Sequence, residues 1–268
     1  MIVKPKIGVE KSEIETPALL IDLDALERYI SKMADYFSKV EANLRPHAKT
    51  HKSPIIAHKQ LDAGAEGVCC QKLGEAEVMV NAGIRDILIT NEVVGPEKIE
   101  RLVGLARHSD VIVAVDNFRV AERTSEAAQR YGVTQDVVIE IDVGIERCGV
   151  RSGEPALNLA RRLLGLKGLR FRGLLGYEGP FFNIPEFDKR RVEANKRNRL
   201  LVDTAELLRR SGIDVEIVSA GSTGTHNITG EYPGITEVEA VSYVFMDSYY
   251  SRLQNVDFEC ALSLLTTF

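Results

Sequence analysis

Short apolar segments alternate with amphipathic segments over most of this chain. Eight of the apolar segments are rich in Val, Ile and Leu and have the length of β-strands, whereas the amphipathic segments have the repeat of helices. The strands are expected at residues 44–50, 67–71, 86–91, 110–115, 137–142, 169–177, 215–220 and 238–245. The helices are expected at residues 53–63, 73–82, 95–107, 117–131, 154–165 and 187–211, with a short turn or helix after Gly224.

This alternation indicates the fold class. Strands that are separated by helices form a parallel sheet with helices packed on it. Eight such repeats favour closure into a (βα)8 TIM-type barrel of the α/β class, which is expected over residues 24–247. An open, doubly wound sheet is the alternative. The charged residues early in 187–211 are interpreted as a solvated helix face.

The two ends of the chain do not fit into the eightfold pattern. Residues 16–23 form a strand pattern ahead of the first helix, and residues 258–268 are an apolar, strand-like run that simply stops. An apolar terminal strand without a polar cap leaves an unpaired edge and exposed apolar surface. We therefore expect residues 1–23 and 248–268 to be parts of a second β-domain that is incomplete at the C-terminus.

The length, charge and cysteine content of the chain argue against some classes of protein. The chain has 268 residues and a net charge of −5, which argues against general affinity for nucleic acid. No apolar run approaches the length of a membrane span. The four cysteines form no CxxC pair, and the adjacent Cys69 and Cys70 are expected on opposite faces of a strand. With no signal peptide, a reducing cytoplasm is the simplest compartment.

The run Leu-Arg-Pro-His-Ala-Lys-Thr-His-Lys at residues 44–52 is unusually basic for a buried barrel strand. If it is extended, Arg45, His47, Lys49 and His51 share one face. We interpret that face as a site for an anionic ligand at the carboxyl end of the strand. A lysine among cations has a lowered pKa and is a better nucleophile toward an aldehyde. The alternative is a solvated basic edge strand.

Three later segments carry further candidate chemistry at strand ends. Arg147, in the run Asp142–Gly149, suits a phenolate or carboxylate, or is a surface arginine. Tyr177 lies between glycines, where it either stacks on a planar ring or packs in the core. The small residues of 219–225 follow the seventh strand, where barrels commonly bind phosphate.

Glu239 is an acidic residue on the otherwise apolar eighth strand. If it is buried, it requires a cationic or protonated partner, such as a pyridinium nitrogen. Alternatively, it lies at the solvent edge of the strand. A nucleophilic lysine, ring contacts, a phosphate loop and this carboxylate together describe a site for pyridoxal phosphate.

Four motifs carry a resemblance to a known family. Residues 16–26 (Thr-Pro-Ala-Leu-Leu-Ile-Asp-Leu-Asp-Ala-Leu), 45–52, 142–149 and 219–225 resemble the alanine racemase-like (fold type III) pyridoxal phosphate enzymes. Residues 243–247 (Tyr-Val-Phe-Met-Asp) are similar to the D-threonine aldolase / D-serine dehydratase branch. The resemblance extends over essentially the whole chain.

The resemblance implies roles for individual residues. It implies that Lys49 binds the cofactor covalently, that Arg147 lies near the phenolic oxygen and that Tyr177 lies by the ring. It places Glu239 at the ring nitrogen and adds Gln71 as a further cofactor contact. The phosphate is expected at Gly221, Ser222, Thr223 and Gly224 and at the backbone near Ser242 and Tyr243.

The chain departs from this branch in one respect. Its members are longer and end in a β-domain whose His-x-Asp or His-x-Cys motif binds a divalent metal (Mn, Mg or Zn). The one such motif here, His108-Ser-Asp110, enters the fourth strand at its N-terminal end, which is the wrong face of the barrel. We therefore expect the metal ligands to lie outside this chain, and none is assigned among its residues, His47 and His51 included.

The resemblance implies a pyridoxal phosphate-dependent lyase. The expected reaction is retro-aldol cleavage of a D-3-hydroxy amino acid to glycine and an aldehyde. One alternative is a D-serine or 3-hydroxyaspartate dehydratase, and another is a non-catalytic protein that binds pyridoxal phosphate. The expected partners are a small D-amino acid substrate and a second copy of the chain in a homodimer, with no nucleic acid and no membrane.

Overall fold

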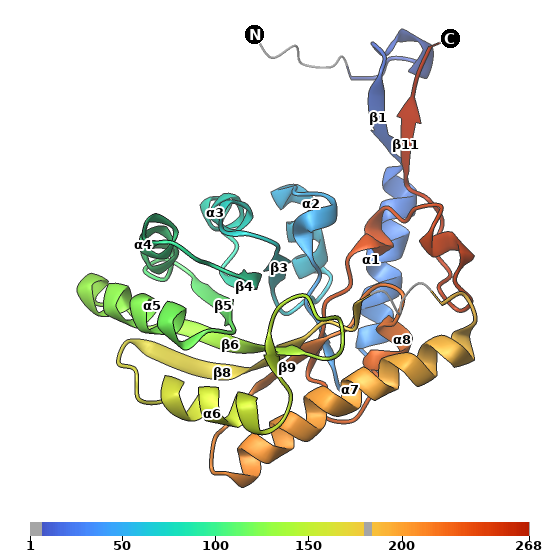
Figure 1. Cartoon of the computed structure of the whole chain (residues 1–268). Coiled ribbons are helices and arrows are strands. Elements are labelled where there is room, and N and C mark those ends of the chain that lie inside the picture. Colours follow the sequence, from blue (N-terminus) through green and yellow to red (C-terminus); the bar gives the residue numbers. More distant parts are fainter. Residues whose placement is uncertain (1–6, 180–183, 268) are drawn as a thin grey trace.

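The computed structural model describes residues 7–179 and 184–267, and its centre is a sheet of parallel strands with helices on the outside (Figure 1). Eight strands follow one another in the order β2-β10-β9-β8-β6-β5-β4-β3. Their bounds are β2 (Asn43–Leu44), β3 (Val68–Cys70), β4 (Asp86–Glu92), β5 (Asp110–Val115), β6 (Gln135–Asp142), β8 (Leu169–Gly176), β9 (Ile217–Ala220) and β10 (Glu237–Val238). A ninth, β7 (Val150–Arg151), pairs with the end of β6.

The two ends of this strand order, β2 and β3, meet each other. His47 forms a parallel bridge with Cys69, and the Cys69 N–H donates to the carbonyl oxygen of Pro46 at 2.9 Å. The Glu66 N–H donates to the carbonyl oxygen of Leu44 at 3.0 Å. Because these contacts close the sheet, the predicted barrel is confirmed and the open sheet is wrong.

Helices follow most of the strands and cover the outer face of the barrel (Figure 1). They are α1 (Leu23–Phe37), α2 (Pro54–Asp62), α3 (Leu73–Asn81), α4 (Pro96–Leu105), α5 (Phe118–Tyr131), α6 (Glu154–Leu163), α7 (Phe187–Arg210) and α8 (His226–Thr229). Short 3-10 turns are formed by Lys11–Glu13, Ala48–Thr50, Ser242–Val244 and Tyr250–Arg252. No helix within residues 7–179 and 184–267 combines the length and the apolar character needed to span a membrane.

Apolar side chains form separate clusters on the two faces of the sheet. The inner cluster comprises Cys69, Leu88, Ile112, Ala114, Val138, Leu175 and Ile217, whereas Cys70 belongs to the larger outer cluster under the helices. This division follows from the alternation of side chains along a strand. The prediction that Cys69 and Cys70 face opposite ways is confirmed.

Two predicted strands are reduced to two residues each. The strand predicted at 44–50 ends at Leu44, because Pro46 has no N–H and the Lys49 N–H donates to Nδ1 of His47 at 3.3 Å. The strand predicted at 238–245 ends at Val238, because the N–H groups of Val241 and Tyr243 donate to Oγ1 of Thr223. In both segments a side chain takes the hydrogen bonds that a neighbouring strand would otherwise accept.

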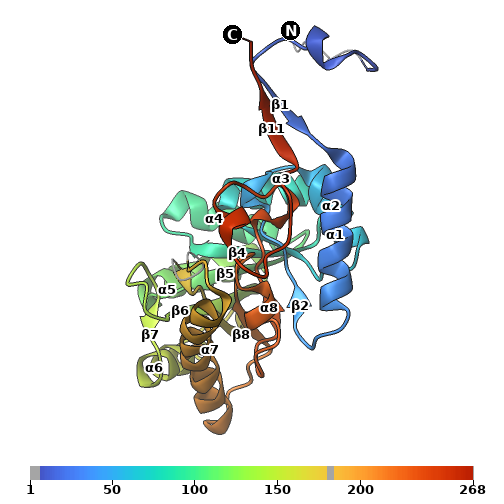
Figure 2. The same cartoon turned by 90° about the vertical axis from the view of Figure 1, so that its right-hand side faces the viewer.

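The chain ends form a small sheet of their own. β1 (Ala18–Ile21) pairs antiparallel with β11 (Leu262–Leu265), and both strands project away from the barrel in Figures 1 and 2. Leu19 and Leu264 on this sheet are 70% and 61% exposed. The two predicted terminal strands therefore exist and pair with each other. Their assignment to a second domain stays a prediction.

The charged helix predicted at 187–211 is not only a solvated face. Arg190, in α7, has no exposed surface, although several of its charged neighbours are in solvent. Its guanidinium donates to the carbonyl oxygens of Gly224 at 2.8 Å and Ile184 at 2.7 Å, and also to those of Pro185 and Gln254. The interpretation of the whole cluster as solvated is wrong for this residue.

Candidate active site

A cavity opens where the strands end at their carboxyl termini, which is where barrel proteins carry their functional residues. Its lining residues are His47, Lys49, Gln71, Thr90, Arg147, Leu175, Tyr177, Gly221, Glu239 and Val241. Six of these were predicted from the sequence as cofactor contacts: Lys49, Gln71, Arg147, Tyr177, Gly221 and Glu239. The structure therefore brings residues that follow six different strands into one site.

Lys49 lies in the 3-10 turn that follows β2, and its pKa is lowered. Burial is the main cause, because it disfavours the charged amine, and Arg147 lowers the pKa further. The nearby carboxylate of Glu239 acts in the opposite direction. The predicted lowering of this pKa has the right direction, but desolvation contributes more to it than neighbouring cations do.

The four basic residues of 45–51 do not share one ligand-facing surface. Arg45 lies at the opposite end of the barrel, where it pairs with Asp86 and Glu237 at the beginnings of β4 and β10. His51 is turned toward α2, where its Nδ1 accepts the Ser53 N–H at 3.0 Å. The prediction of one ligand-facing surface is wrong for these two residues, because Arg45 lies at the end of the barrel where the strands begin and His51 lies beyond the end of the strand.

His47 remains in the cavity and supports Lys49. Its Nδ1 accepts the Lys49 N–H, so the ring proton is on Nε2, which donates to Oγ1 of Thr90 at 3.1 Å. Burial and the Lys49 charge hold the pKa of His47 well below its usual value. A neutral imidazole therefore fixes the backbone of the lysine turn.

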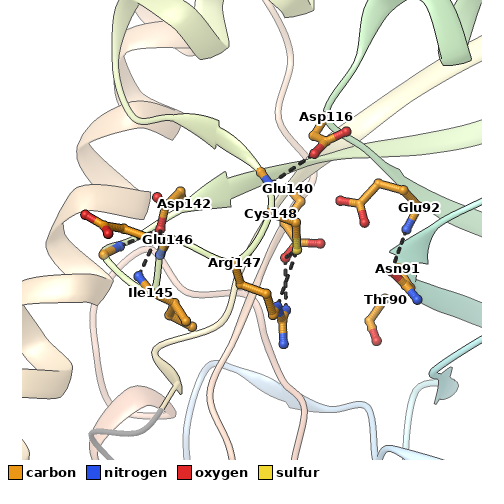
Figure 3. A network of polar contacts seen from close by, with 12 residues as sticks. Thr90, Asn91, Glu92, Asp116, Glu140, Asp142, Ile145, Glu146, Arg147 and Cys148 are labelled. Atoms are coloured by element: carbon orange, nitrogen blue, oxygen red, sulfur yellow. Dashed lines mark hydrogen bonds and ion pairs between the residues drawn. The ribbon is translucent and has the colours of Figure 1, made fainter.

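Tyr177 lies between the two cations of the cavity. The centre of its ring is 5.8 Å from Nζ of Lys49 and 5.4 Å from Cζ of Arg147. The Arg147 guanidinium is held by Oε1 of Glu140, 3.0 Å away, and its Nε donates to Sγ of Cys148 at 3.3 Å (Figure 3). The ring thus presents a flat surface next to an arginine of fixed position.

Glu239 is buried, as one of its two predicted alternatives required. Its Oε1 accepts a hydrogen bond from Oγ of Ser219 at 2.9 Å. Burial raises the pKa of Glu239 to about 8, against the lowering effect of Ser219 and Lys49. A cationic group facing this carboxyl would favour its ionised form.

The loop between β9 and α8 is held by two charged residues that the sequence did not single out. Glu178, fully buried, accepts the Gly221 N–H at 3.1 Å and the hydroxyl groups of Ser222 and Thr225. On the other side of the loop, Arg190 donates to the carbonyl oxygen of Gly224. These contacts fix the direction in which the peptide groups of the loop point.

The orientation of this loop fits an anionic group. Within residues 7–179 and 184–267, the N–H groups of Thr223, Gly224 and Ser242 donate to no other residue, and Thr223 and Gly224 are buried. Buried N–H groups without a partner are costly, so a ligand that accepts from them is expected. Converging backbone N–H groups of this kind are suited to a phosphate. The predicted pyridoxal phosphate therefore fits the residues that are present.

Tyr243 is not part of this arrangement through its side chain. The ring has no exposed surface, and its hydroxyl group accepts from Nε2 of Gln60 at 2.7 Å, away from the cavity. Its N–H donates to Thr223 and is not available to a ligand. The structure thus brings the Tyr243 backbone to the loop but leaves its side chain in the core.

The sequence contains a pattern that could have identified the acidic residues Glu140 and Glu178. Glu140 interrupts the apolar run of β6 in the same way that Glu239 interrupts the eighth predicted strand, and Glu178 directly follows a candidate ring-contacting residue. An ionisable residue in a buried strand requires a specific partner. Applied to Glu140, this rule would have indicated Arg147 or Cys148 as its partner.

Comparison with known proteins agrees with the geometry of the cavity. Residues 21–240 match the family model for the alanine racemase N-terminal domain. D-threonine aldolase from Arthrobacter sp. is 39% identical over 97% of this chain and 69% of the aldolase. D-threo-3-hydroxyaspartate dehydratase from Delftia sp. is 34% identical over 95% of this chain and 67% of the dehydratase.

A solved structure shows the same relationship. The crystal structure of D-threonine aldolase from Filomicrobium marinum matches with a TM-score of 0.92 and 43% identity, over 95% of this chain and 69% of that one. This chain belongs to the alanine racemase N-terminal domain family, and its close homologues include aldolases and a dehydratase. The family membership that the motifs indicated is confirmed.

Proposed function

We propose that this chain is a pyridoxal phosphate-dependent lyase that cleaves D-3-hydroxy amino acids between Cα and Cβ, giving glycine and an aldehyde. The observation that carries the proposal is the position of Lys49. It is a half-buried amine of lowered pKa in a cavity whose rim offers unpaired backbone N–H groups. The 39% identity to a D-threonine aldolase supports the reaction class.

Different residues around the cavity would hold different parts of the cofactor. Lys49 would bind its aldehyde carbon, and the N–H groups of Thr223, Gly224 and Ser242 would hold its phosphate. Arg147 would contact its phenolic oxygen. When bound, the cofactor supplies a ring that accepts the electron pair left at Cα when the Cα–Cβ bond breaks.

Three further residues would complete the contacts to the ring. Tyr177 would lie against its face, and Gln71 would contact it from the end of the second barrel strand. Glu239 is placed to face the ring nitrogen. Its pKa of about 8 means that a neutral partner would leave it protonated, whereas a cationic one would draw it to the carboxylate form.

The chain's own residues prepare Lys49 for its role. Because its pKa is lowered, a larger fraction of the amine is neutral, and only the neutral amine attacks a carbonyl carbon. The hydrogen bond from the Lys49 N–H to His47 fixes the turn, so the amine is held over the cavity. The same amine can later accept or return a proton when substrate has displaced it.

A dehydratase is the second candidate, because a D-threo-3-hydroxyaspartate dehydratase is 34% identical over most of this chain. That reaction removes the α-proton and expels the β-hydroxyl group, so the products differ. Incubation with D-threonine, followed by measurement of acetaldehyde, detects the aldolase. Incubation with D-serine or D-threo-3-hydroxyaspartate, followed by measurement of the oxo acid and ammonia, detects the dehydratase.

Further parts of the proposal rest on the family. We infer that residues 24–247 form the cofactor-binding barrel and that β1 and β11 belong to a second β-domain. A divalent metal with ligands outside this chain, a homodimer and a cytoplasmic location complete this proposal. Size-exclusion chromatography with light scattering measures the oligomeric state, and a monomer would contradict the homodimer.

The decisive experiment is the visible absorption of the protein after incubation with pyridoxal phosphate. A band that borohydride bleaches, and that Lys49→Ala lacks, is the expected result. Lys52→Ala is the matched control, since Lys52 lies three residues further on and is 60% exposed at its side chain. A band that persists in Lys49→Ala, or that is lost in Lys52→Ala, would contradict the assignment. Binding without turnover of any of these substrates would favour the non-catalytic alternative.

A further inference from the structure

Three side chains that the proposed mechanism does not use meet beside Arg147. Glu92 ends β4, Glu140 lies in β6 and Cys148 lies in the loop that follows β6. One oxygen of each carboxyl group and the Sγ atom of Cys148 all lie within 4.8 Å of one another. Figure 3 shows the Glu92 carboxyl group pointing from β4 toward Glu140 and Cys148.

The carboxyl group of Glu140 is incompletely paired. Its side chain is only 4% exposed, and its Oε1 atom accepts hydrogen bonds from Arg147 and, at 2.9 Å, from Sγ of Cys148. Its Oε2 atom is buried and has no partner among the described residues, and the same holds for Oε1 of Glu92. Buried carboxyl oxygens without a partner are costly, so the site lacks a positive group or a proton.

The charges around this point do not balance. Glu92, Glu140 and Asp116 bring three carboxyl groups to the cluster, and Arg147 brings one guanidinium. Among the residues that the structure describes, Asp116 accepts only the Gly149 N–H, at 3.1 Å. Burial and the charge of Glu140 raise the pKa of Glu92 to about 7, as expected for two carboxyl groups close together. With all three ionised, the cluster has two negative charges in excess, and a dication that displaces the Cys148 thiol proton would reduce this excess to one.

We propose that Glu92, Glu140 and Cys148 form a binding site for a divalent cation of the zinc type. A thiolate with two carboxylates suits zinc, which accepts sulfur and oxygen ligands, whereas magnesium and calcium select oxygen alone. The bonds of zinc to such ligands are about 2.0–2.3 Å long, so binding draws the three side chains closer together than they are here.

Binding of the cation would release one proton, from the Cys148 thiol. Without metal, burial and Glu140 raise the pKa of the Cys148 thiol to about 12, so the S–H group is protonated and donates to Glu140. On binding, the Cys148 S–H bond is replaced by a bond from sulfur to the metal, and the proton is released to solvent. Oε1 of Glu140 then keeps Arg147 as its remaining donor, and Oε2 gains a partner.

The site is separate from the metal that the family resemblance leads us to expect. The resemblance leads us to expect that metal at a His-x-Asp or His-x-Cys motif outside this chain, without Glu92, Glu140 or Cys148. The cation proposed here would join β4, β6 and the loop 144–149, and it would fix the carboxylate that holds Arg147. The proposal does not depend on the lyase activity, and its test measures no turnover.

The test is equilibrium dialysis of the purified protein against Zn²⁺, followed by metal analysis and zinc X-ray absorption spectroscopy. We expect one zinc ion with a sulfur neighbour at about 2.3 Å. Cys148→Ser should lose the sulfur neighbour, and Glu92→Gln should bind zinc at least tenfold more weakly. Cys260→Ser is the matched control, because Cys260 is an exposed free thiol outside the cluster, and it should bind like the wild type.

Several results would overturn the proposal. They are the absence of bound zinc, zinc without a sulfur neighbour, and a sulfur neighbour that is lost in Cys260→Ser but kept in Cys148→Ser. An unchanged affinity of Glu92→Gln for zinc would also overturn the proposal. Failure to bind zinc would mean that Glu92 and Glu140 share a proton instead. If Glu92→Gln does not fold, the conservative Cys148→Ser variant still decides the outcome.

Discussion

Replacement of Gly221 by alanine tests whether the shape of the loop after β9 controls binding of the phosphate. Gly221 has a φ of +88°, a backbone conformation that residues with a side chain rarely adopt. A Cβ atom at this position would lie 2.8 Å from Cγ1 of Val238 in the neighbouring strand β10. Gly83 provides a matched control, because it has the same φ of +88° but nothing within 4 Å of its added Cβ.

The size of each effect can be worked out from these two positions. The left-handed backbone costs a residue with a Cβ about 1–2 kcal/mol, and both variants carry that cost. Only Gly221→Ala adds overpacking against Val238, at about 1–3 kcal/mol. We therefore expect Gly83→Ala to lower the free energy of unfolding by about 1–2 kcal/mol, and Gly221→Ala to lower it by about 2–5 kcal/mol.

Two measurements separate stability from binding. Urea denaturation gives the free energy of unfolding, and titration with pyridoxal phosphate gives the dissociation constant. If the loop moves to relieve the contact, the N–H groups of Thr223 and Gly224 are displaced, and a loss of about 1.4 kcal/mol weakens binding tenfold. Gly83→Ala should bind like the wild type. Equal stability of the two variants, or unchanged binding by Gly221→Ala, would refute the reasoning.

Two further predictions concern charged residues. Arg190→Met removes the donor to the carbonyl groups of Gly224, Ile184 and Gln254, whereas the Pro185 carbonyl still accepts from the Gln254 N–H. At about 1–3 kcal/mol per unsatisfied group, less the recovered desolvation of the charge, the free energy of unfolding should fall by about 3–5 kcal/mol. An unchanged midpoint of urea denaturation in Arg190→Met would contradict this prediction. Glu92 has a pKa of about 7 in the fold against an ordinary value of 4.5, so between these pH values the folded state binds more protons than the unfolded state. The stabilisation from protonated Glu92 is fully present below pH 4.5 and is lost as the pH rises through about 7. With a chelator present to remove metal, the free energy of unfolding of the wild type should therefore fall relative to that of Glu92→Gln between pH 4.5 and 7. Parallel pH profiles of the two proteins would show that Glu92 is not the responsible group.

The sequence predicted the barrel because its signal is local and repeated. The strands β3, β4, β5, β6, β8 and β9 are apolar runs, each separated from the next barrel strand by a helix, so neighbouring segments alone determine the pattern. The ends of β2 and β10 could not be predicted in this way. They depend on hydrogen bonds made by the side chains of His47 and Thr223, which local apolar patterns do not reveal.

The candidate site was predictable to the extent that strand ends of a barrel converge at one rim. This rule places Lys49 and Arg147 in one cavity, whereas Glu239 lies near the beginning of its predicted strand and is assigned because a buried carboxylate needs a partner. The support of the site was not predictable, because it depends on pairings between distant residues. Nothing in the α7 sequence distinguishes Arg190 from the exposed charges beside it, since its partners come from other segments.

The short contact between β2 and β3 makes one seam of the barrel easier to open than the rest. β2 has two residues and meets β3 through an isolated bridge and a few hydrogen bonds, whereas β6 and β8 have eight residues each. Lys49 follows β2 and Gln71 follows β3, so these two cavity residues lie on opposite sides of the seam. A ligand that contacts both residues bridges the seam, so part of its binding free energy opposes separation of β2 from β3. The amide protons of Val68–Cys70 would then exchange more slowly once the ligand is in place.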